Sequence, residues 1–131
     1  MSSSGPKFAL TEVKRLAQEY LSGKTQAINF TAPRRSTESV VTVLLCTPNL
    51  ANQKIATGLL DLKETDFFSR KWQWGDVFDE YGLEGYEGHN WYIKFCVVND
   101  DGEYIEEVSF HPLEQVMALP DGRTLKVTYN A

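Results

Sequence analysis

Residues 91–110, WYIKFCVVNDDGEYIEEVSF, carry the clearest structural pattern in the sequence. Over residues 91–98 the side chains alternate between the two faces with the period of a half-buried β-strand. Residues 99–102, Asn-Asp-Asp-Gly, are a strong hairpin turn signal. Residues 103–110 then form the return strand, so the whole stretch predicts an antiparallel hairpin.

This hairpin separates its side chains into two sets. A four-residue loop pairs Val98 with Glu103, whereas a two-residue loop pairs Asp100 with Glu103, and both registers give the same faces. The predicted core face carries Trp91, Ile93, Phe95, Val97, Tyr104, Val108 and Phe110. The opposite face carries Tyr92, Lys94, Glu107, Ser109 and His111, and in the tighter register Tyr92 lies directly opposite His111.

The segments before the hairpin have the period of helices. Apolar side chains recur at helical spacing over residues 10–21 and again over residues 50–60. Between them, Pro33 fits a helix start, and Ser36 or Thr37 could cap the apolar run 40–45. Residues 25–31 read as a short strand or an extended connector, and residues 65–66 could begin a short helical turn.

The remaining segments have the character of strands and turns. We expect a strand over residues 74–81, a flexible acidic loop over residues 82–88, and a second hairpin from residues 113–119 and 124–129. Helices followed by a run of strands indicate an α+β fold, with N-terminal helices packed on an antiparallel sheet.

The length of 131 residues fits one domain, which we place at residues 8–131 after a tail at residues 1–7. No run approaches the roughly 18 apolar residues of a membrane span. No secretory signal is visible, and the two cysteines lack the spacing of metal ligands. We therefore expect a cytoplasmic protein without membrane association.

The formal net charge of −5 is unevenly distributed. Residues 7–35 hold six basic and two acidic residues, whereas residues 72–121 hold twelve acidic residues and a single lysine. A polarised surface of this kind can bind RNA on one side and a basic partner on the other. The uneven charge is equally expected if the acidic residues form a solvated face that keeps the protein soluble.

Motifs for nucleotide binding, serine hydrolysis or zinc binding are absent from the sequence. Asp76, Asp79 and Glu80 are close in sequence and invite a metal interpretation, but solvated carboxylates explain them better. We expect no metal site and no cofactor.

The Tyr92, Lys94 and His111 side chains suggest a different chemistry. Cleaving RNA without a metal requires a base for the 2′-hydroxyl, cations for the phosphate charge and an acid for the leaving oxygen. These residues could fill those roles, or they could simply form a polar sheet face. Likewise, Trp72 and Trp74 beside Arg70 and Lys71 could stack bases or could pack in the core.

Four short motifs in the second half resemble the MqsR family of toxins. They are Asp66-Phe67-Phe68, the sequence WGDVF at residues 74–78, WYIK at residues 91–94, and Val108-Ser109-Phe110. The helix at residues 10–14 resembles the opening of the family as well, so the match spans about residues 8–111.

The resemblance implies a RelE-like fold and a metal-independent endoribonuclease that cleaves mRNA and is neutralised by an antitoxin. By position, the family's active-site tyrosine falls on Tyr92 and its C-terminal catalytic lysine on His111. A further lysine falls on Ser69, and a glutamine falls on Gly75. Histidine exchanges protons near neutral pH more readily than lysine, and Arg70 or Lys71 could replace the missing cation.

These inferences lead to one hypothesis and one alternative. The hypothesis is a toxin-like ribonuclease of a toxin–antitoxin or defence system, with the catalytic residues Tyr92, His111, Lys94 and Arg70. The residues expected to bind RNA are Lys71, Trp72, Lys14, Arg15, Arg34 and Arg35. The alternative is a non-catalytic inhibitor, immunity protein or defence component on the same scaffold, whose acidic face docks a basic surface.

Overall fold

The predicted hairpin is present as β4, His89–Asn99, and β5, Glu103–Pro112, in a computed structural model that describes residues 5–30 and 35–130. The helices are α1, Leu10–Leu21, α2, Arg35–Leu44, and α3, Pro48–Asp61, with short 3₁₀ turns η1, Thr25–Ala27, and η2, Glu64–Asp66. The other strands are β1, Ile28–Asn29, β2, Phe67–Gln73, β3, Asp76–Tyr86, β6, Met117–Ala118, and β7, Thr124–Leu125.

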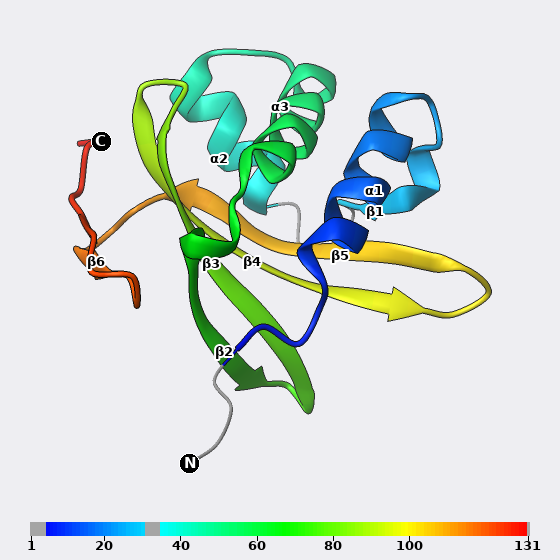
Figure 1. Cartoon of the computed structure of the whole chain (residues 1–131). Coiled ribbons are helices and arrows are strands. Elements are labelled where there is room, and N and C mark those ends of the chain that lie inside the picture. The colour runs from blue at the N-terminus through cyan, green and yellow to red at the C-terminus, as the bar shows by residue number, and fades with distance from the viewer. Residues whose placement is uncertain (1–4, 31–34, 131) are drawn as a thin grey trace.

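The main sheet has the strand order β1-β5-β4-β3-β2. Every pair in it is antiparallel except the short parallel pairing of β1 with β5. Figure 1 shows the three helices along one side of this sheet and β6 near its far end. The predicted α+β class, with helices packed on a largely antiparallel sheet, is confirmed. The opposite side of the sheet, called the open face below, carries Tyr92 and Lys94.

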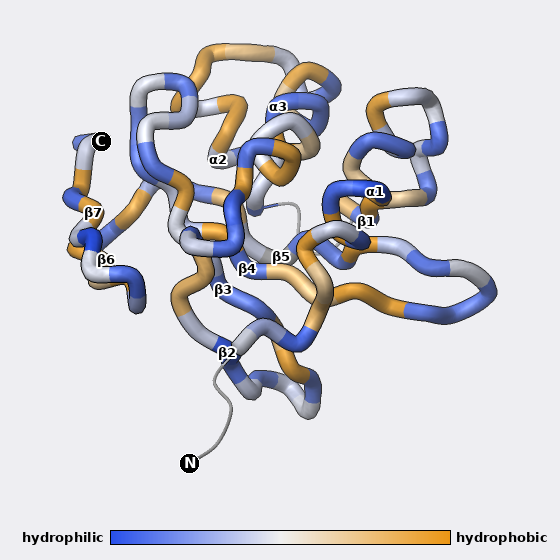
Figure 2. The backbone as a smooth tube through the Cα atoms, viewed as in Figure 1, coloured by the Kyte–Doolittle hydropathy of each residue, from blue (hydrophilic) through white to orange (hydrophobic). Residues whose placement is uncertain are grey.

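The core lies between the helices and the strand positions that the alternation predicts. Trp91, Ile93 and Phe95 are fully buried there, in one apolar cluster that also contains Val13 and Leu16 of α1. The turn between β4 and β5 is hydrophilic, as Figure 2 shows. Helix α1 has the predicted bounds because its apolar side chains recur on one face and because Ser22 and Gly23 end it.

The other two helices differ from the prediction at their starts. Thr47 caps α3 by accepting a hydrogen bond from the Leu50 N–H, and Pro48 occupies the first turn, so this helix begins two residues earlier than expected. Ser36 and Thr37 lie inside α2 and are buried, so neither caps it. The predicted start at Pro33 lies outside the described residues.

The predicted acidic loop at residues 82–88 is wrong, because β3 continues to Tyr86. The chain turns only at Glu87 and Gly88, both of which have positive φ, as tight hairpin turns require. A second turn of this kind, at Trp74 and Gly75, joins β3 to β2, a strand that the sequence analysis did not identify. Gly82 and Gly85 therefore interrupt the pattern of the strand without ending it, whereas Gly88 belongs to the turn.

The register of β4 with β5 combines one confirmed and several corrected expectations. Tyr92 pairs with His111, as predicted, but Asn99 pairs with Glu103, which matches neither expected loop. A β-bulge accounts for this one-residue change of register between the turn and Tyr92. Lys94 pairs with Ser109, whereas the next residue, Phe95, pairs with Glu107.

This bulge moves the first half of β5 to the other face. Glu107 consequently lies on the helix-covered face, where it is buried, and Ile105 takes the core position expected for Tyr104. Tyr104 pairs with Val98, away from the core face. The side chain of Val108, which was also expected in the core, lies outside what the structure describes.

The C-terminal segment packs on the open face. Its hairpin is confirmed at the predicted position but pairs only two residues on each side, β6 with β7. It lies over Gly82, where an added Cβ would come within 2.5 Å of the Met117 sulfur. Arg123 holds the segment through ion pairs with Asp66 and Glu84. Among the described residues, no helix is long and apolar enough to cross a membrane.

The close approach of Gly58 to β5 provides a test of this packing. An added Cβ at Gly58 of α3 would lie 2.7 Å from the Phe110 ring. We expect Gly58→Val to lower the free energy of unfolding by about 2 kcal/mol or more, since overpacking costs roughly 1–3 kcal/mol and valine gives no large gain in helix propensity. Urea unfolding measures the change.

The matched control is Thr57→Val, one residue earlier on the exposed side of α3. Because surface substitutions usually change stability by less than about 0.5 kcal/mol, this variant should unfold close to the wild type. Equal stability of the Gly58 and Thr57 variants would contradict the packing of α3 on β5.

Candidate functional site

Polar side chains from three strands meet on the open face. Tyr92 and His111 are register partners across β4 and β5, and Glu80 and Lys94 are partners across β3 and β4. Ser109 lies opposite Lys94. Because strand residues two apart share a face, the register alone gathers these five groups.

Tyr92 is anchored by a carboxylate. Its hydroxyl donates a short hydrogen bond to Oε2 of Glu80, which is buried. Burial raises the pKa of Tyr92 well above the usual range for tyrosine, and the hydrogen bond to Glu80 raises it further. The phenol therefore keeps its proton, so that it can orient its neighbours but is not a base at neutral pH.

His111 has one ring nitrogen fixed and the other directed away from the backbone. Nδ1 lies 2.8 Å from the Pro112 carbonyl oxygen. Since a carbonyl can only accept, Nδ1 carries the proton and the neutral ring has its lone pair on Nε2. The ring also lies against that of Tyr92, with centroids 5.2 Å apart. This arrangement prepares Nε2 to accept a proton from a ligand.

Lys94 is a nearly buried cation with 6% of its surface exposed. Its ammonium donates a 2.6 Å hydrogen bond to Oε1 of Gln73 and lies 5.1 Å from the Trp74 ring centre. Burial lowers the pKa of Lys94, and the charge of Lys71 lowers it further. A lysine with a lowered pKa gives up a proton more readily than an exposed one.

His111 lines three cavities, of which one of about 700 Å³ reaches neither Tyr92 nor Lys94. The other two cavities border this cluster. The larger, of about 490 Å³, is lined by Arg35, Ser36, Ser39, Gln73, Trp74, Lys94, Ser109, Phe110, His111 and Glu114. The smaller, of about 270 Å³, places Lys71 beside Glu80 and Tyr92. The larger cavity brings three bases, Arg35, Lys94 and His111, together beside one carboxylate, and we call it the cationic cavity.

Other predicted residues lie elsewhere. Arg70 is the register partner of Asp79 and lies on the other face of β2. Its guanidinium donates hydrogen bonds of 2.8 and 3.1 Å to the Gly5 carbonyl. Trp72 is 72% exposed on that same face. Lys14 and Arg15 belong to α1, on the helix-covered side, where Arg15 is paired with Glu12, Glu19 and Glu103. Arg34 lies outside the described residues.

Three residues at the cluster were not among the predicted site residues. Glu80 is the partner of Tyr92, and Gln73 and Trp74 enclose the Lys94 ammonium. The alternation of β2 would have placed Gln73 with Lys71, had the strand been identified. The positive φ of Trp74, 55°, which turns its ring onto Lys94, has no signal in the sequence beyond the following glycine. No three His, Cys, Asp or Glu side chains of the described residues gather as a metal site would require.

Glu107 is a buried acid beneath the same strands, with 1% of its surface exposed. Neither carboxyl oxygen makes a well-formed hydrogen bond, although the Ser36 hydroxyl and the Ser109 N–H lie close enough to favour the ionised form. Burial outweighs them and raises the pKa of Glu107 from 4.5 to about 8. Glu107 is therefore protonated in the folded chain at neutral pH.

This burial predicts a pH-dependent stability. Because the folded pKa lies above the unfolded one, the contribution of Glu107 is complete below pH 4.5 and is lost as the pH rises through 8. We expect Glu107→Gln to match the wild type at pH 4.5 within about 1 kcal/mol, and to exceed it by about 3 kcal/mol at pH 9. Urea unfolding at both pH values measures the difference.

The control is Glu106→Gln, at the half-buried neighbouring position on β5. It should leave the slope of stability against pH unchanged. A wild type whose stability does not fall relative to Glu107→Gln between these pH values would refute the buried, unpaired acid.

Comparison with known proteins supplies no family for this chain: no family model, curated protein or solved structure matches it. The resemblance to MqsR toxins consequently rests on the short motifs of the sequence. The function has to be argued from the cationic cavity and the side chains around it.

Proposed function

We propose that the chain is a metal-independent endoribonuclease that cleaves single-stranded mRNA in the cytoplasm, as the toxin of a toxin–antitoxin or defence system. One observation carries the proposal: the cationic cavity holds His111, whose Nε2 has a lone pair in the neutral ring, together with the buried Lys94. Base, acid and positive charge are thereby available from side chains alone.

His111 is the proposed general base. Its Nε2 takes the proton of a ribose 2′-hydroxyl, and the resulting oxygen attacks the adjacent phosphorus. The hydrogen bond from Nδ1 to Pro112 fixes the ring during this step, because rotating the imidazole would break it. Contact with the Tyr92 ring, whose hydroxyl is held by Glu80, also restrains the His111 ring. Tyr92 is thus a positioning residue.

Lys94 is the proposed acid and phosphate ligand. It lies diagonally from His111 across β4 and β5, a spacing of roughly 7 Å that suits groups on either side of one phosphodiester. Its proton goes to the departing 5′-oxygen as the bond from phosphorus breaks, leaving a 2′,3′-cyclic phosphate and a 5′-hydroxyl. Arg35, on the same cavity, stabilises the additional negative charge on the phosphate in the transition state.

The alternative is the non-catalytic binding protein, and one observation favours it. Gln73 and Trp74 enclose the Lys94 ammonium, and a lysine so covered would have to exchange these contacts before it reached a phosphate. In that case the cluster stabilises the β2–β3 turn, and function lies in the acidic surface. Expression in cells separates the two, since a toxin arrests growth and a binding protein does not.

Cleavage of a labelled single-stranded RNA in the presence of EDTA tests the proposal. We expect His111→Asn and Lys94→Met each to lower the cleavage rate at least about 100-fold, the usual contribution of a proton-transfer group. Tyr92→Phe should lower it less than about tenfold. An otherwise identical all-deoxy strand should stay intact because it lacks the attacking hydroxyl.

The matched controls are two arginine variants. Arg35→Gln removes a cation from the cavity and should slow cleavage, whereas Arg70→Gln removes one from the other face and should not. Wild-type protein that leaves RNA intact, or a His111→Asn variant with full activity, would rule out the proposed reaction.

A further inference from the structure

The β2–β3 hairpin separates from β4 before the hairpin reaches its turn. Strand β3 pairs with β4 only between Tyr86↔His89 and Asp79↔Phe95. Residues 96–99 of β4 are paired with β5 on one side, and no described strand lies along their other side. This leaves four residues of strand edge, roughly 13 Å long, open within the fold. Figure 1 shows the two hairpins diverging at this point.

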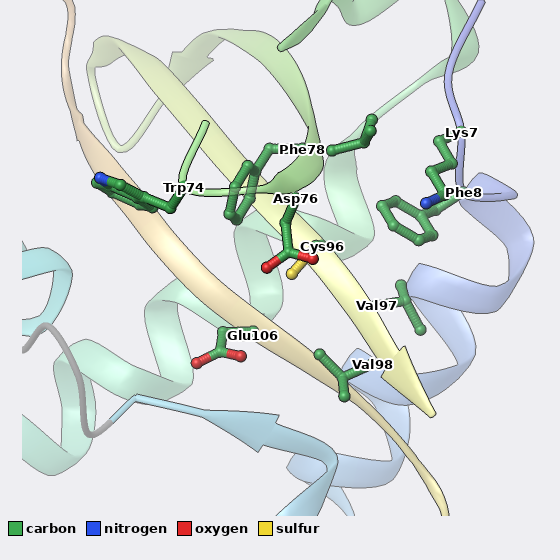
Figure 3. Close-up of a pocket in the computed structure, with 10 residues that line it drawn as sticks. Lys7, Phe8, Trp74, Asp76, Phe78, Cys96, Val97, Val98 and Glu106 are labelled. Carbon is green, nitrogen blue, oxygen red and sulfur yellow. The ribbon is translucent and has the colours of Figure 1, made fainter. Parts of the chain in front are cut away.

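A cleft of about 490 Å³ occupies the space between the hairpins. Its wall includes the apolar side chains of Phe78, Cys96 and Val98. Figure 3 shows Trp74 at one end of the cleft and Lys7 with Phe8 at the other. The backbone N–H groups of Lys7 and Phe8 are bound to the Asp79 carboxylate, which fixes that end.

The charge of the cleft comes from Asp76 and Glu106, which both line it. Within the part of the chain that the structure describes, neither carboxylate has an ion-pair partner, whereas Glu84, Glu87 and Glu103 are all paired with basic residues. Burial raises the pKa of the Cys96 thiol to about 11, and the negative charges of Glu106 and Asp76 contribute to the rise. The cleft thus has a negative potential that Lys7 offsets only at one end.

We propose that this cleft binds an extended basic peptide segment of a partner protein, which pairs with the open edge of β4. In such strand addition, main-chain hydrogen bonds supply affinity and alternate side chains supply specificity. Asp76, Phe78, Val98 and Glu106 share the open face, so lysine or arginine side chains on that face of the peptide would reach Asp76 and Glu106 with their methylene stems on Phe78 and Val98. The alternate, apolar side chains of the peptide would face Val77 and Val97. The proposal is independent of RNA cleavage, because none of these residues belongs to the proposed reaction.

The negative charge of the cleft favours a basic peptide over RNA. Two unpaired carboxylates repel a phosphate backbone, so RNA is disfavoured there. A second copy of the chain could occupy the cleft only with one of its own edge strands. In the described sheet the basic edge strand is β2, which carries Arg70 and Lys71. Self-association through β2 is therefore the competing outcome that an experiment has to separate.

Calorimetric titration of the full chain with defined peptides tests the proposal. The probe is a capped octapeptide of alternating valine and lysine, and its comparator alternates valine and glutamate. We expect the lysine peptide to bind, with affinity that falls as salt rises, and the glutamate peptide not to bind. N-methylation of the valine nitrogens should abolish binding, because it removes the backbone donors that strand addition needs.

Two double variants with the same change in charge locate the binding site. Asp76→Asn with Glu106→Gln should weaken the lysine peptide at least about tenfold, whereas Asp61→Asn with Glu64→Gln, exposed and outside the cleft, should change it less than about twofold. Unfolding midpoints show that both variants fold. Equal weakening by the two pairs, equal binding of both peptides, or a dimer that the cleft pair alone abolishes would overturn the proposal.

Discussion

The pairing of β4 with β5 positions both the open face and the buried core. Its bulge between Lys94 and Phe95 lets one strand satisfy two requirements. On the open side His111 comes opposite Tyr92, and on the covered side Ile105 enters the core while the acid of Glu107 is buried with it. Without the bulge, Glu107 would stay on the open face. His111 opposite Tyr92 and Ile105 in the core could then not both occur in one strand.

The sequence predicted the helices and the central hairpin well because their patterns are local. Alternation in residues 91–98 and helical spacing in residues 10–21 each follow from which face is buried. The prediction of a loop at residues 82–88 was wrong because it took Gly82 for a loop residue. Gly82 lies in a strand and has no side chain because Met117, far along the chain, packs on it. The bulge was equally invisible, so Glu107 was assigned to the wrong face. The Tyr92–His111 pairing was predicted from a two-residue loop; the actual turn pairs Asn99 with Glu103, and the bulge restores the predicted partners beyond it.

The charge distribution takes a more definite form in the folded chain. Helix α1 carries two basic residues, and one of them, Arg15, is paired with Glu12, Glu19 and Glu103. Positive charge instead gathers in the cationic cavity, and unpaired negative charge gathers in the cleft on the other side of the β2–β3 turn. Trp74 lines both, so the two features share one wall. An acidic chain can therefore offer an anion a local binding site.

In the proposed function, RNA binds to the open face around His111. NMR titration with a single-stranded 2′-O-methyl RNA, which binds without being cleaved, tests it most directly. We expect the largest shifts in the His111 ring, the Lys94 side chain and the Trp74 indole N–H, and no shift of the Trp72 indole. Shifts centred on Trp72, Arg70 and helix α1, or none at saturating RNA, would contradict it.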